Sequence, residues 1–232
     1  MSHAGHTVPA PEGFVPHVVA HHFESQEQEY QSAKLGFWLF LATEILLFGG
    51  LFAAYFYFHD IYLEDFVFGG KQLSWKLGTT NTVILLVSSY TMAMGVRSAQ
   101  LSQKKAMINY LIITFLCACG FLVVKYFEYT AKIHHGYLPG GFYHPTLAAQ
   151  AEHPGLLDFK AMGMFFALYW TMTGIHGFHV FLGMVLIAWL IWRGGKGHFH
   201  QNHYMPVDLV GLYWHLVDLI WIFLFPLLYL VP

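Results

Sequence analysis

Residues 36–50 read GFWLFLATEILLFGG, an apolar stretch that contains one carboxyl group, that of Glu44. The apolar run extends on both sides, from Leu35 to about Phe58. A membrane helix needs about 20 consecutive apolar residues, so this run is long enough to cross a bilayer. A charged side chain at the bilayer centre costs about 3 kcal/mol or more. The stretch therefore predicts a membrane helix in which Glu44 is protonated or has a partner.

The composition of the 232-residue chain also indicates a membrane protein. Hydrophobic residues make up 56% of the chain and charged residues 10%, whereas soluble domains carry about 25% charged residues. The mean hydropathy is +0.49. A net charge of −2, with no basic run longer than Lys104–Lys105, gives no reason to expect a nucleic-acid partner.

Five apolar stretches are long enough to cross a membrane, and none alternates like a strand of a membrane barrel. They predict an all-α, polytopic bundle of five transmembrane helices in residues 32–232. Residues 1–31 lack a signal-peptide pattern, and we expect them to form an extramembrane arm that is flexible at first and becomes helical near Glu24. The predicted spans are about 33–59, 77–97, 106–132, 159–192 and 207–231.

The basic residues predict the orientation of these spans. Five spans place the two termini on opposite sides, and basic residues prefer the cytoplasmic side. Both arginines fall on the inner side if the N-terminus is cytoplasmic, which favours N-in and C-out. The residues placed inside are then Lys34, Arg97, Lys104, Lys105, Arg193 and Lys196, and those placed outside are Lys71, Lys76, Lys132 and Lys160.

Ionisable residues inside the predicted spans need partners. In three spans, two such residues are three positions apart, so they share one face of a helix. Polar side chains on facing membrane helices hydrogen-bond to one another. We therefore predict an interhelical polar network made of Lys125 and Glu128, His176 and His179, and His215 and Asp218. In the last pair, the carboxylate can accept a hydrogen bond from the imidazole one turn earlier or from a neighbouring helix.

A metal centre is the more specific functional alternative for these residues, because carboxylates and imidazoles on several helices can bind a transition metal. No Glu-x-x-His motif falls inside the spans, and their histidines are too few for a haem-copper centre. We therefore expect no metal site, and only adventitious metal binding by residues 195–204. Plain packing is the simpler role for the small residues of the spans, which are Gly49, Gly50, Ala53, Gly174, Gly177 and Gly183.

Five motifs, in this order and at this spacing to the spans, resemble subunit III of the haem-copper respiratory oxidases in its five-helix bacterial form. The resemblance covers almost all of residues 21–232. The motifs are HHFESQEQEYQSAKLGFWLFLATEILLFGGLFAAYFYF at 21–58, NTVILLVSSYTMAMG at 81–95, KYFEY at 125–129, TGIHGFHVFLG at 173–183 and YWHLVDLIWIFLF at 213–225.

The resemblance implies a non-catalytic subunit that packs mainly against the haem-bearing subunit I, with subunit II and small or cytochrome c-bearing subunits as further neighbours. It implies that haem and copper lie in the partner subunits and that this chain binds phospholipid. The complex would be a proton-pumping cytochrome c oxidase of the bacterial cytoplasmic (inner) membrane, reducing O2 to water. A quinol oxidase or a relative associated with nitric oxide reductases remains open.

The resemblance also places Glu44 at a buried acidic position of the family. No Lys or Arg lies within one turn of Glu44, and burial favours the protonated carboxyl. We therefore expect Glu44 to donate a hydrogen bond to His176, His179 or His215 and to tie its helix to the others. The alternative from another class is a small transporter with a proton relay through Glu44, although neither internal repeats nor broken helices are evident.

Phospholipid binding is expected mainly at Arg193, which follows an apolar run and corresponds to a basic position of the family. A guanidinium at the interface can bind a lipid phosphate through two hydrogen bonds. Weaker candidates for lipid contact are His22, Lys34 and Trp38.

Overall fold

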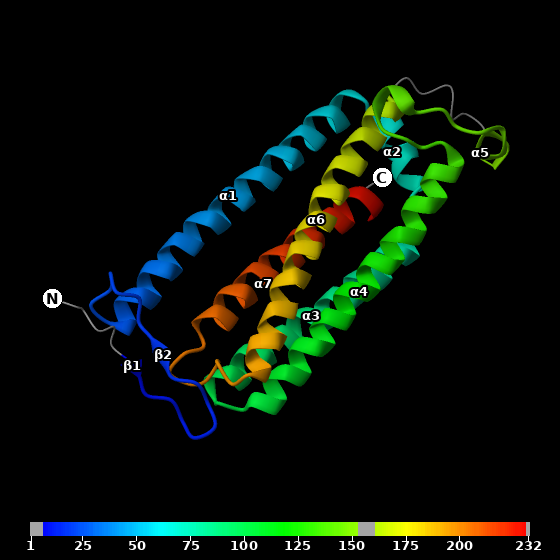
Figure 1. Cartoon of the computed structure of the whole chain (residues 1–232). Helices are drawn as coiled ribbons and strands as arrows, with labels where there is room; N and C mark the ends of the chain where they lie inside the picture. Colours follow the sequence, from blue (N-terminus) through cyan, green and yellow to red (C-terminus); the bar gives the residue numbers. More distant parts are fainter. Residues whose placement is uncertain (1–6, 153–160, 231–232) are drawn as a thin grey trace. The chain divides into compact units, whose positions relative to one another are not determined.

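The computed structural model describes residues 7–152 and 161–230. Five helices are long and apolar enough to cross a membrane (Figure 1). The prediction of an all-α protein with five membrane helices is confirmed. The predicted start of the fourth span at 159 and the end of the fifth at 231 lie outside the described residues. The five helices are α1 (Gln26–Ile61), α3 (Trp75–Gln100), α4 (Lys104–His135), α6 (Met162–Gly195) and α7 (Met205–Phe225), which continues as the π-helical turn η2 (Pro226–Leu230).

Short elements flank or join these helices. Two short strands, β1 (Thr7–Val8) and β2 (His17–Val18), pair in antiparallel orientation before α1. The helix α2 (Leu63–Lys71) lies between α1 and α3. The 3-10 turn η1 (Gly140–Phe142) and the helix α5 (Leu147–Glu152) follow α4.

The chain divides into two compact units, and each long helix contributes residues to both. Unit 1 consists of Met1–Glu44, Leu86–Ala118 and Val180–Asp218, and unit 2 consists of Ile45–Leu85, Cys119–His179 and Leu219–Pro232. Unit 1 therefore contains the β1–β2 hairpin and the connections from α3 to α4 and from α6 to α7. Unit 2 contains α2, η1, α5 and η2.

A side-chain cap makes α1 begin earlier than the predicted span. The backbone N–H of Gln28 donates to Ser25 Oγ at 3.2 Å, and the Gln28 side chain accepts from the backbone N–H of Glu24 at 2.7 Å. This exchange resembles a capping box, which satisfies N–H groups that the first turn leaves free. At 36 residues, α1 is about 54 Å long. It must therefore tilt or extend beyond a hydrocarbon core of about 30 Å.

A glycine ends α4. Gly136 has φ +77, and the backbone N–H of Tyr137 donates to the carbonyl of Lys132 at 3.0 Å, the long-range hydrogen bond of a Schellman motif. A Cβ atom at Gly136 would lie 2.0 Å from the carbonyl oxygen of His144. Both the backbone conformation and the lack of space therefore require glycine here.

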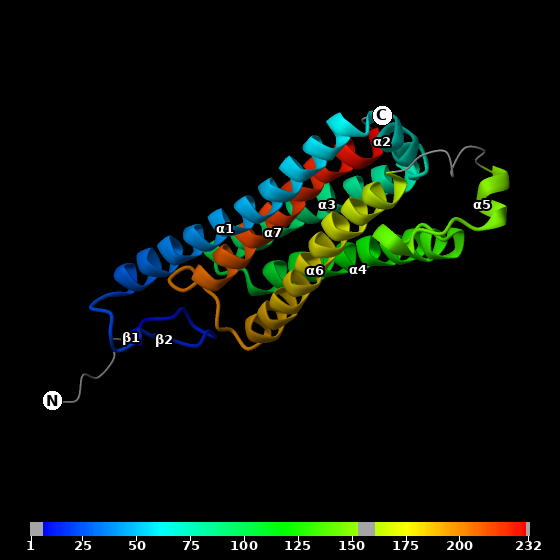
Figure 2. The ribbon, with the colours of Figure 1, turned by 90° about the horizontal axis from the view of Figure 1, so that it is seen from above.

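Residues 7–25 form the β1–β2 hairpin and its connection to α1, and the predicted start of the helix near Glu24 is confirmed by α1, which begins at Gln26. The hairpin lies beside the loop that joins α6 and α7 (Figures 1 and 2). The backbone N–H of Val15 donates to the carbonyl of Gly197 at 3.0 Å, and the Asn202 side chain donates to the carbonyl of Pro9 at 3.0 Å. Tertiary hydrogen bonds fix this segment, and no local sequence pattern signals them.

Small residues allow close packing at some positions only. A Cβ atom at Gly183 would lie 2.6 Å from the Trp214 ring in unit 1. In unit 2, a Cβ atom at Gly69 would lie 2.5 Å from the Phe165 ring. The packing role predicted for Gly183 is therefore confirmed. It is wrong for Gly49, Gly50, Gly174 and Gly177, where a Cβ atom would meet nothing within 4 Å.

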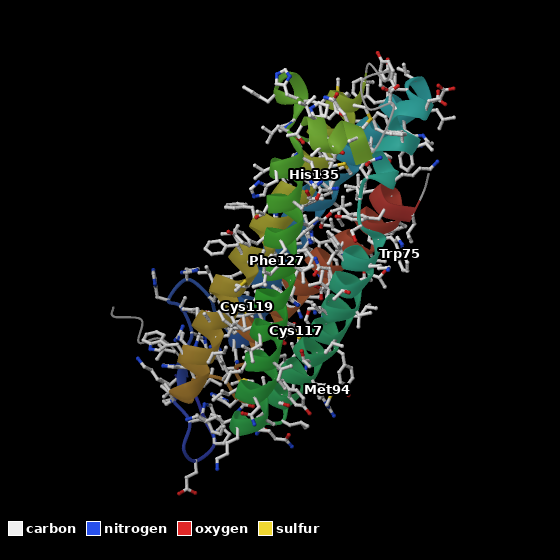
Figure 3. All side chains as sticks on the ribbon, turned by 90° about the vertical axis from the view of Figure 1, so that its right-hand side faces the viewer. Trp75, Met94, Cys117, Cys119, Phe127 and His135 are labelled. Carbon is white, nitrogen blue, oxygen red and sulfur yellow. The ribbon has the colours of Figure 1, made fainter. Side chains whose placement is uncertain are left out.

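Large apolar side chains remain exposed on the long helices, as expected of helices whose surroundings are apolar. On α1, Leu46 is 74% exposed, and the most apolar window of this helix is only 11% buried within the chain. Trp75 at the start of α3 and Phe127 on α4 are also exposed (Figure 3). A lipid bilayer or partner helices must cover these surfaces.

Candidate functional site

A buried ion pair lies on α4 in unit 2. The Lys125 ammonium lies 3.0 Å from Oε2 of Glu128, and the two residues are 5% and 2% exposed. The structure therefore brings together the two residues that the spacing of three placed on one helix face. A buried pair is stable only where further hydrogen bonds satisfy its remaining donors and acceptors.

Two tyrosines supply these hydrogen bonds. The hydroxyls of Tyr169 on α6 and Tyr229 in η2 both donate to Oε1 of Glu128, at 3.0 and 2.5 Å. The Lys125 ammonium also donates to the Tyr229 hydroxyl at 2.8 Å. Three elements of unit 2 are therefore joined at one carboxylate. Neither tyrosine was predicted from the sequence.

Aromatic rings surround the ammonium group of Lys125. Its Nζ atom lies 4.9–5.4 Å from four ring centroids, a distance at which the ring faces attract a cation. In the membrane interior, where water is scarce, these ring faces stabilise the ammonium group in place of a hydration shell. The four rings are those of Tyr129, Tyr169, Trp221 and Tyr229.

Lys132 is the third charged residue near the end of α4, and it has a different partner. Its ammonium donates to the backbone carbonyl of Gln72, which follows α2. In the described parts of the chain, the side-chain ion pairs are Lys125 with Glu128 and His17 with Glu29. Lys132 therefore ties α4 to the end of α2.

The two histidines of α6 in unit 2 have separate environments. His176 is fully buried, and its ring lies 5.5 Å from Phe121 and 5.3 Å from Trp221. Neither nitrogen of His176 has a hydrogen-bond partner among the described residues. His179 uses Nδ1 to contact the carbonyl of Ile175 at 2.7 Å, within its own helix. The structure thus places His176 in aromatic packing.

In unit 1, α7 is tied to α3 by two neighbouring serines. Nδ1 of His215 lies 2.8 Å from Ser89 Oγ, and the indole N–H of Trp214 donates to Ser88 Oγ at 3.0 Å. These contacts join residues that are 126 positions apart. His215 is therefore part of an interhelical contact, with a partner that spacing alone could not indicate.

Asp218 is buried on the same helix, and no hydrogen bond joins its carboxylate to His215, which was one of the two partners considered. Both carboxylate oxygens lack a hydrogen-bond partner among the described residues. Ser88 and Ser89 approach the carboxyl without reaching hydrogen-bond geometry. The reason is that the His215 ring is directed to Ser89 on α3.

Glu44 is half-buried in the chain by itself, so its full burial stays a prediction for the complex. Its Oε2 atom is inaccessible, and the carboxyl lies within electrostatic range of the buried Tyr213 hydroxyl on α7. The partial exposure follows from α1, which packs on the rest of unit 1 with one side only. The predicted hydrogen bond from Glu44 to a histidine stays a prediction.

Arg193 lies in the last turn of α6, close to another basic side chain. Its Nη2 atom lies 3.5 Å from Nδ1 of His198, and its guanidinium carbon lies 5.3 Å from the centroid of the Trp189 ring. The ion pairs of the described residues involve other side chains, so no carboxylate there forms an ion pair with this guanidinium. The group is half-buried and can still reach a ligand.

The weaker lipid candidates lie at the start of the chain. The Lys34 ammonium donates to the Tyr30 hydroxyl at 3.4 Å. Trp38, one turn later, is 53% exposed, and His22 is exposed beside the Phe23 ring. Lys34 and Trp38 are on α1, whereas His22 precedes it.

An apolar cavity lies in unit 2 between α1 and the end of α7. Its volume is about 250 Å³, and no ionisable residue lines it. Such a cavity suits a hydrocarbon chain more than a polar substrate. Its lining residues are Phe52, Phe56, Phe223, Pro226 and Leu227.

Chemically, these polar groups form helix-to-helix contacts. Cation, carboxylate and hydroxyl groups satisfy one another in unit 2, and hydroxyl, imidazole and indole groups do so in unit 1. Among residues 7–152 and 161–230, no group of three or more His, Cys, Asp or Glu side chains is placed to hold a metal ion. The described cysteines, Cys117 and Cys119, are free thiols on α4 (Figure 3).

Fold and site together define a polytopic membrane protein whose buried polar residues connect its helices. Comparison with known proteins is consistent with this class. The family model for cytochrome c oxidase subunit III matches residues 158–231. Cytochrome c oxidase subunit 3 of Thermostichus vulcanus is 33% identical over 198 residues, which are 85% of this chain and 86% of that protein.

Quinol oxidase subunits are also similar. A probable quinol oxidase subunit 3 of Staphylococcus saprophyticus is 27% identical over 91% of this chain and 95% of its own length. The cytochrome bo(3) ubiquinol oxidase subunit 3 of Pseudomonas putida is 28% identical over 87% of this chain and 86% of its own length. The chain belongs to the subunit III family of the haem-copper oxidases, so the predicted family is confirmed.

Proposed function

We propose that the chain, an accessory subunit III of a haem-copper oxidase and part of a complex with other subunits, packs mainly against the haem-bearing subunit I, with subunit II and smaller subunits as further neighbours. In this proposal the haem and copper are held by those partners. The chain has no catalytic role and stabilises the complex.

The buried Lys125–Glu128 cluster is the observation that supports this proposal best. Its charges are neutralised within the chain, and its hydroxyl donors come from two other elements. Such a closed cluster fixes helices relative to one another within unit 2. The exposed apolar surface of α1 is available for partner helices and lipid.

Removal of the subunit tests the proposed role. An oxidase purified from cells that lack this chain is expected to keep its haem spectrum and its initial turnover, and to lose activity faster than the complete complex. Complementation with the wild-type chain is the control. Loss of haem, or absence of initial turnover in an otherwise assembled complex, would show that the chain contributes to the catalytic centre.

For the electron donor, we propose cytochrome c. The support is the 33% identity to a cytochrome c oxidase subunit, compared with 27–28% for the two quinol oxidase subunits. Turnover of the purified complex with reduced cytochrome c and with a quinol distinguishes the two. Turnover with quinol alone would assign the chain to the quinol oxidases.

We also propose that Arg193 binds the phosphate of a phospholipid. Its guanidinium lies at the end of a membrane helix, without a carboxylate ion pair among the described residues. Mass spectrometry of the purified complex is expected to show loss of bound phospholipid in Arg193→Gln. The control is Arg97→Gln, at the exposed end of α3. Unchanged lipid content in both variants would contradict this assignment.

The proposed topology places the N-terminus in the cytoplasm and the C-terminus outside the inner membrane. Thr146 and Gln201 are exposed, and they lie in the connections on either side of α6. In a background without Cys117 and Cys119, a cysteine at position 146 should react with an impermeant thiol reagent added outside intact cells. A cysteine at 201 should react only after lysis, and the reverse result would invert the topology.

A further inference from the structure

The hairpin and the loop between α6 and α7 meet at two histidine rings, both in unit 1. His17 on β2 and His203 in the loop stack with ring centroids 3.8 Å apart and an interplanar angle of 13°. His203 is 9% exposed. The His17 ring also contacts the Glu29 carboxylate, with Nε2 and Oε2 at 2.8 Å. This stack is the closest ring contact between the arm and the loop.

Basic side chains, which are positively charged or become so on protonation, surround the stacked rings. The carboxylate of Glu29, on α1, faces His17 rather than the buried ring of His203. A second positive charge on the stacked rings would therefore meet like charges at short range. The groups that act on His203 are His17 from β2, His198 and His200 from the loop, and Arg193 from α6. Lys104 of α4 lies beside Gly197 of the same loop.

Burial is the main reason why protonation of His203 is unfavourable in the docked arrangement. Together with the charges of His17, His200, Arg193 and His198, burial lowers the pKa of His203 to about 3 from its ordinary value of 6.5. Burial also lowers the pKa of His200, which lies beside Phe14 of the arm. Burial therefore disfavours protonation of both imidazoles while the arm is docked, and release of the arm removes the part of this burial that the arm supplies.

We propose that the stack of His17 on His203 is a pH-sensitive latch, which holds the N-terminal hairpin on the loop between α6 and α7 at neutral pH and releases it in acid. When the arm is released, His203 of the loop can bind a proton that it does not bind while the arm is docked. Docking is therefore strongest above pH 6.5 and weakens as the pH falls from 6.5 towards 3. The occupant of the loop surface is residues 7–23 of the same chain.

The size of the effect follows from His203 alone. Between pH 7.5 and pH 5.5, the released form gains protonation at its ordinary pKa, whereas the docked form stays neutral. The equilibrium constant for release should therefore rise about tenfold over this range. His200 adds to the effect in the same direction.

The amide of Val15 reports docking directly, because its N–H donates to the carbonyl of Gly197. Hydrogen exchange of the complete purified oxidase, followed by mass spectrometry, gives the protection of the peptide that contains Val15. Each rate is divided by the intrinsic rate at the same pH. Protection in the wild type should fall about tenfold from pH 7.5 to pH 5.5, and protection that changes less than twofold would overturn the proposal.

Variants assign the effect to the stack. His203→Phe keeps a flat ring without a titrating group, so the tenfold fall in protection should shrink to the smaller part that His200 contributes. The control His21→Phe changes an exposed histidine of the arm outside the stack and should keep the tenfold fall. A tenfold fall in His203→Phe would show that another group is responsible. If His203→Phe releases the arm already at pH 7.5, His203→Tyr is used as the non-titrating variant instead. Release of the arm in both variants would contradict the proposal by showing that imidazole itself is required.

Discussion

Glu128→Gln is expected to destabilise unit 2 strongly, because it leaves the Lys125 ammonium buried without its counter-charge. Gln keeps an oxygen that the hydroxyls of Tyr169 and Tyr229 can approach, so the change removes mainly the charge. Removing one partner of a buried ion pair costs about 3–5 kcal/mol, whereas replacing both is often neutral. The lower value corresponds to about a 150-fold change in the unfolding equilibrium.

The assay is unfolding of the chain in the purified complex by increasing concentrations of SDS, followed by tryptophan fluorescence. The double variant Lys125→Met with Glu128→Gln should recover most of the loss, since the Met side chain keeps the apolar stem of Lys125. Glu64→Gln, at an exposed position of α2, is the control and should change stability by less than about 0.5 kcal/mol. A cost below about 1 kcal/mol for Glu128→Gln, or additive costs in the double variant, would refute the reasoning.

Three further changes test other contacts. Gly183→Ala should cost about 1–3 kcal/mol in the same assay because the new methyl group meets the Trp214 ring, whereas Gly177→Ala, with open space, should be close to neutral. Tyr55→Phe removes the buried hydrogen bond to the backbone of η2 and should cost about 1 kcal/mol. Glu44→Gln should keep turnover and proton pumping, whereas Glu44→Ala should weaken the binding of the subunit to the complex. A Gln variant that stays bound but pumps few protons would favour a proton relay through Glu44.

The membrane fold could be predicted from the sequence because hydropathy alone defines it. Each span is a continuous apolar run, and a membrane helix must satisfy its backbone groups internally. The start of α1 was predicted near Glu24, and the helix begins at Gln26, where Ser25 and Gln28 cap it ahead of the apolar run. The docked N-terminal arm could not be predicted, because its hydrogen bonds go to residues almost 200 positions later in the chain.

The polar contacts were predictable only within one helix. Lys125 and Glu128 meet because residues three apart share a helix face. The tyrosines that complete the cluster are 41 and 101 positions from Glu128, so no spacing rule applies. For the same reason, the local rule suggested Asp218 as the partner of His215, whereas tertiary packing supplies Ser89 from α3.

The most direct test of the central claim is purification of this chain through an affinity tag from native membranes in mild detergent. The account predicts a constant ratio of the chain to a haem-bearing subunit, haem absorption in the purified material and reduction of O2 to water. Isolation of the chain alone, with the haem and the oxidase activity in a separate fraction, would contradict it.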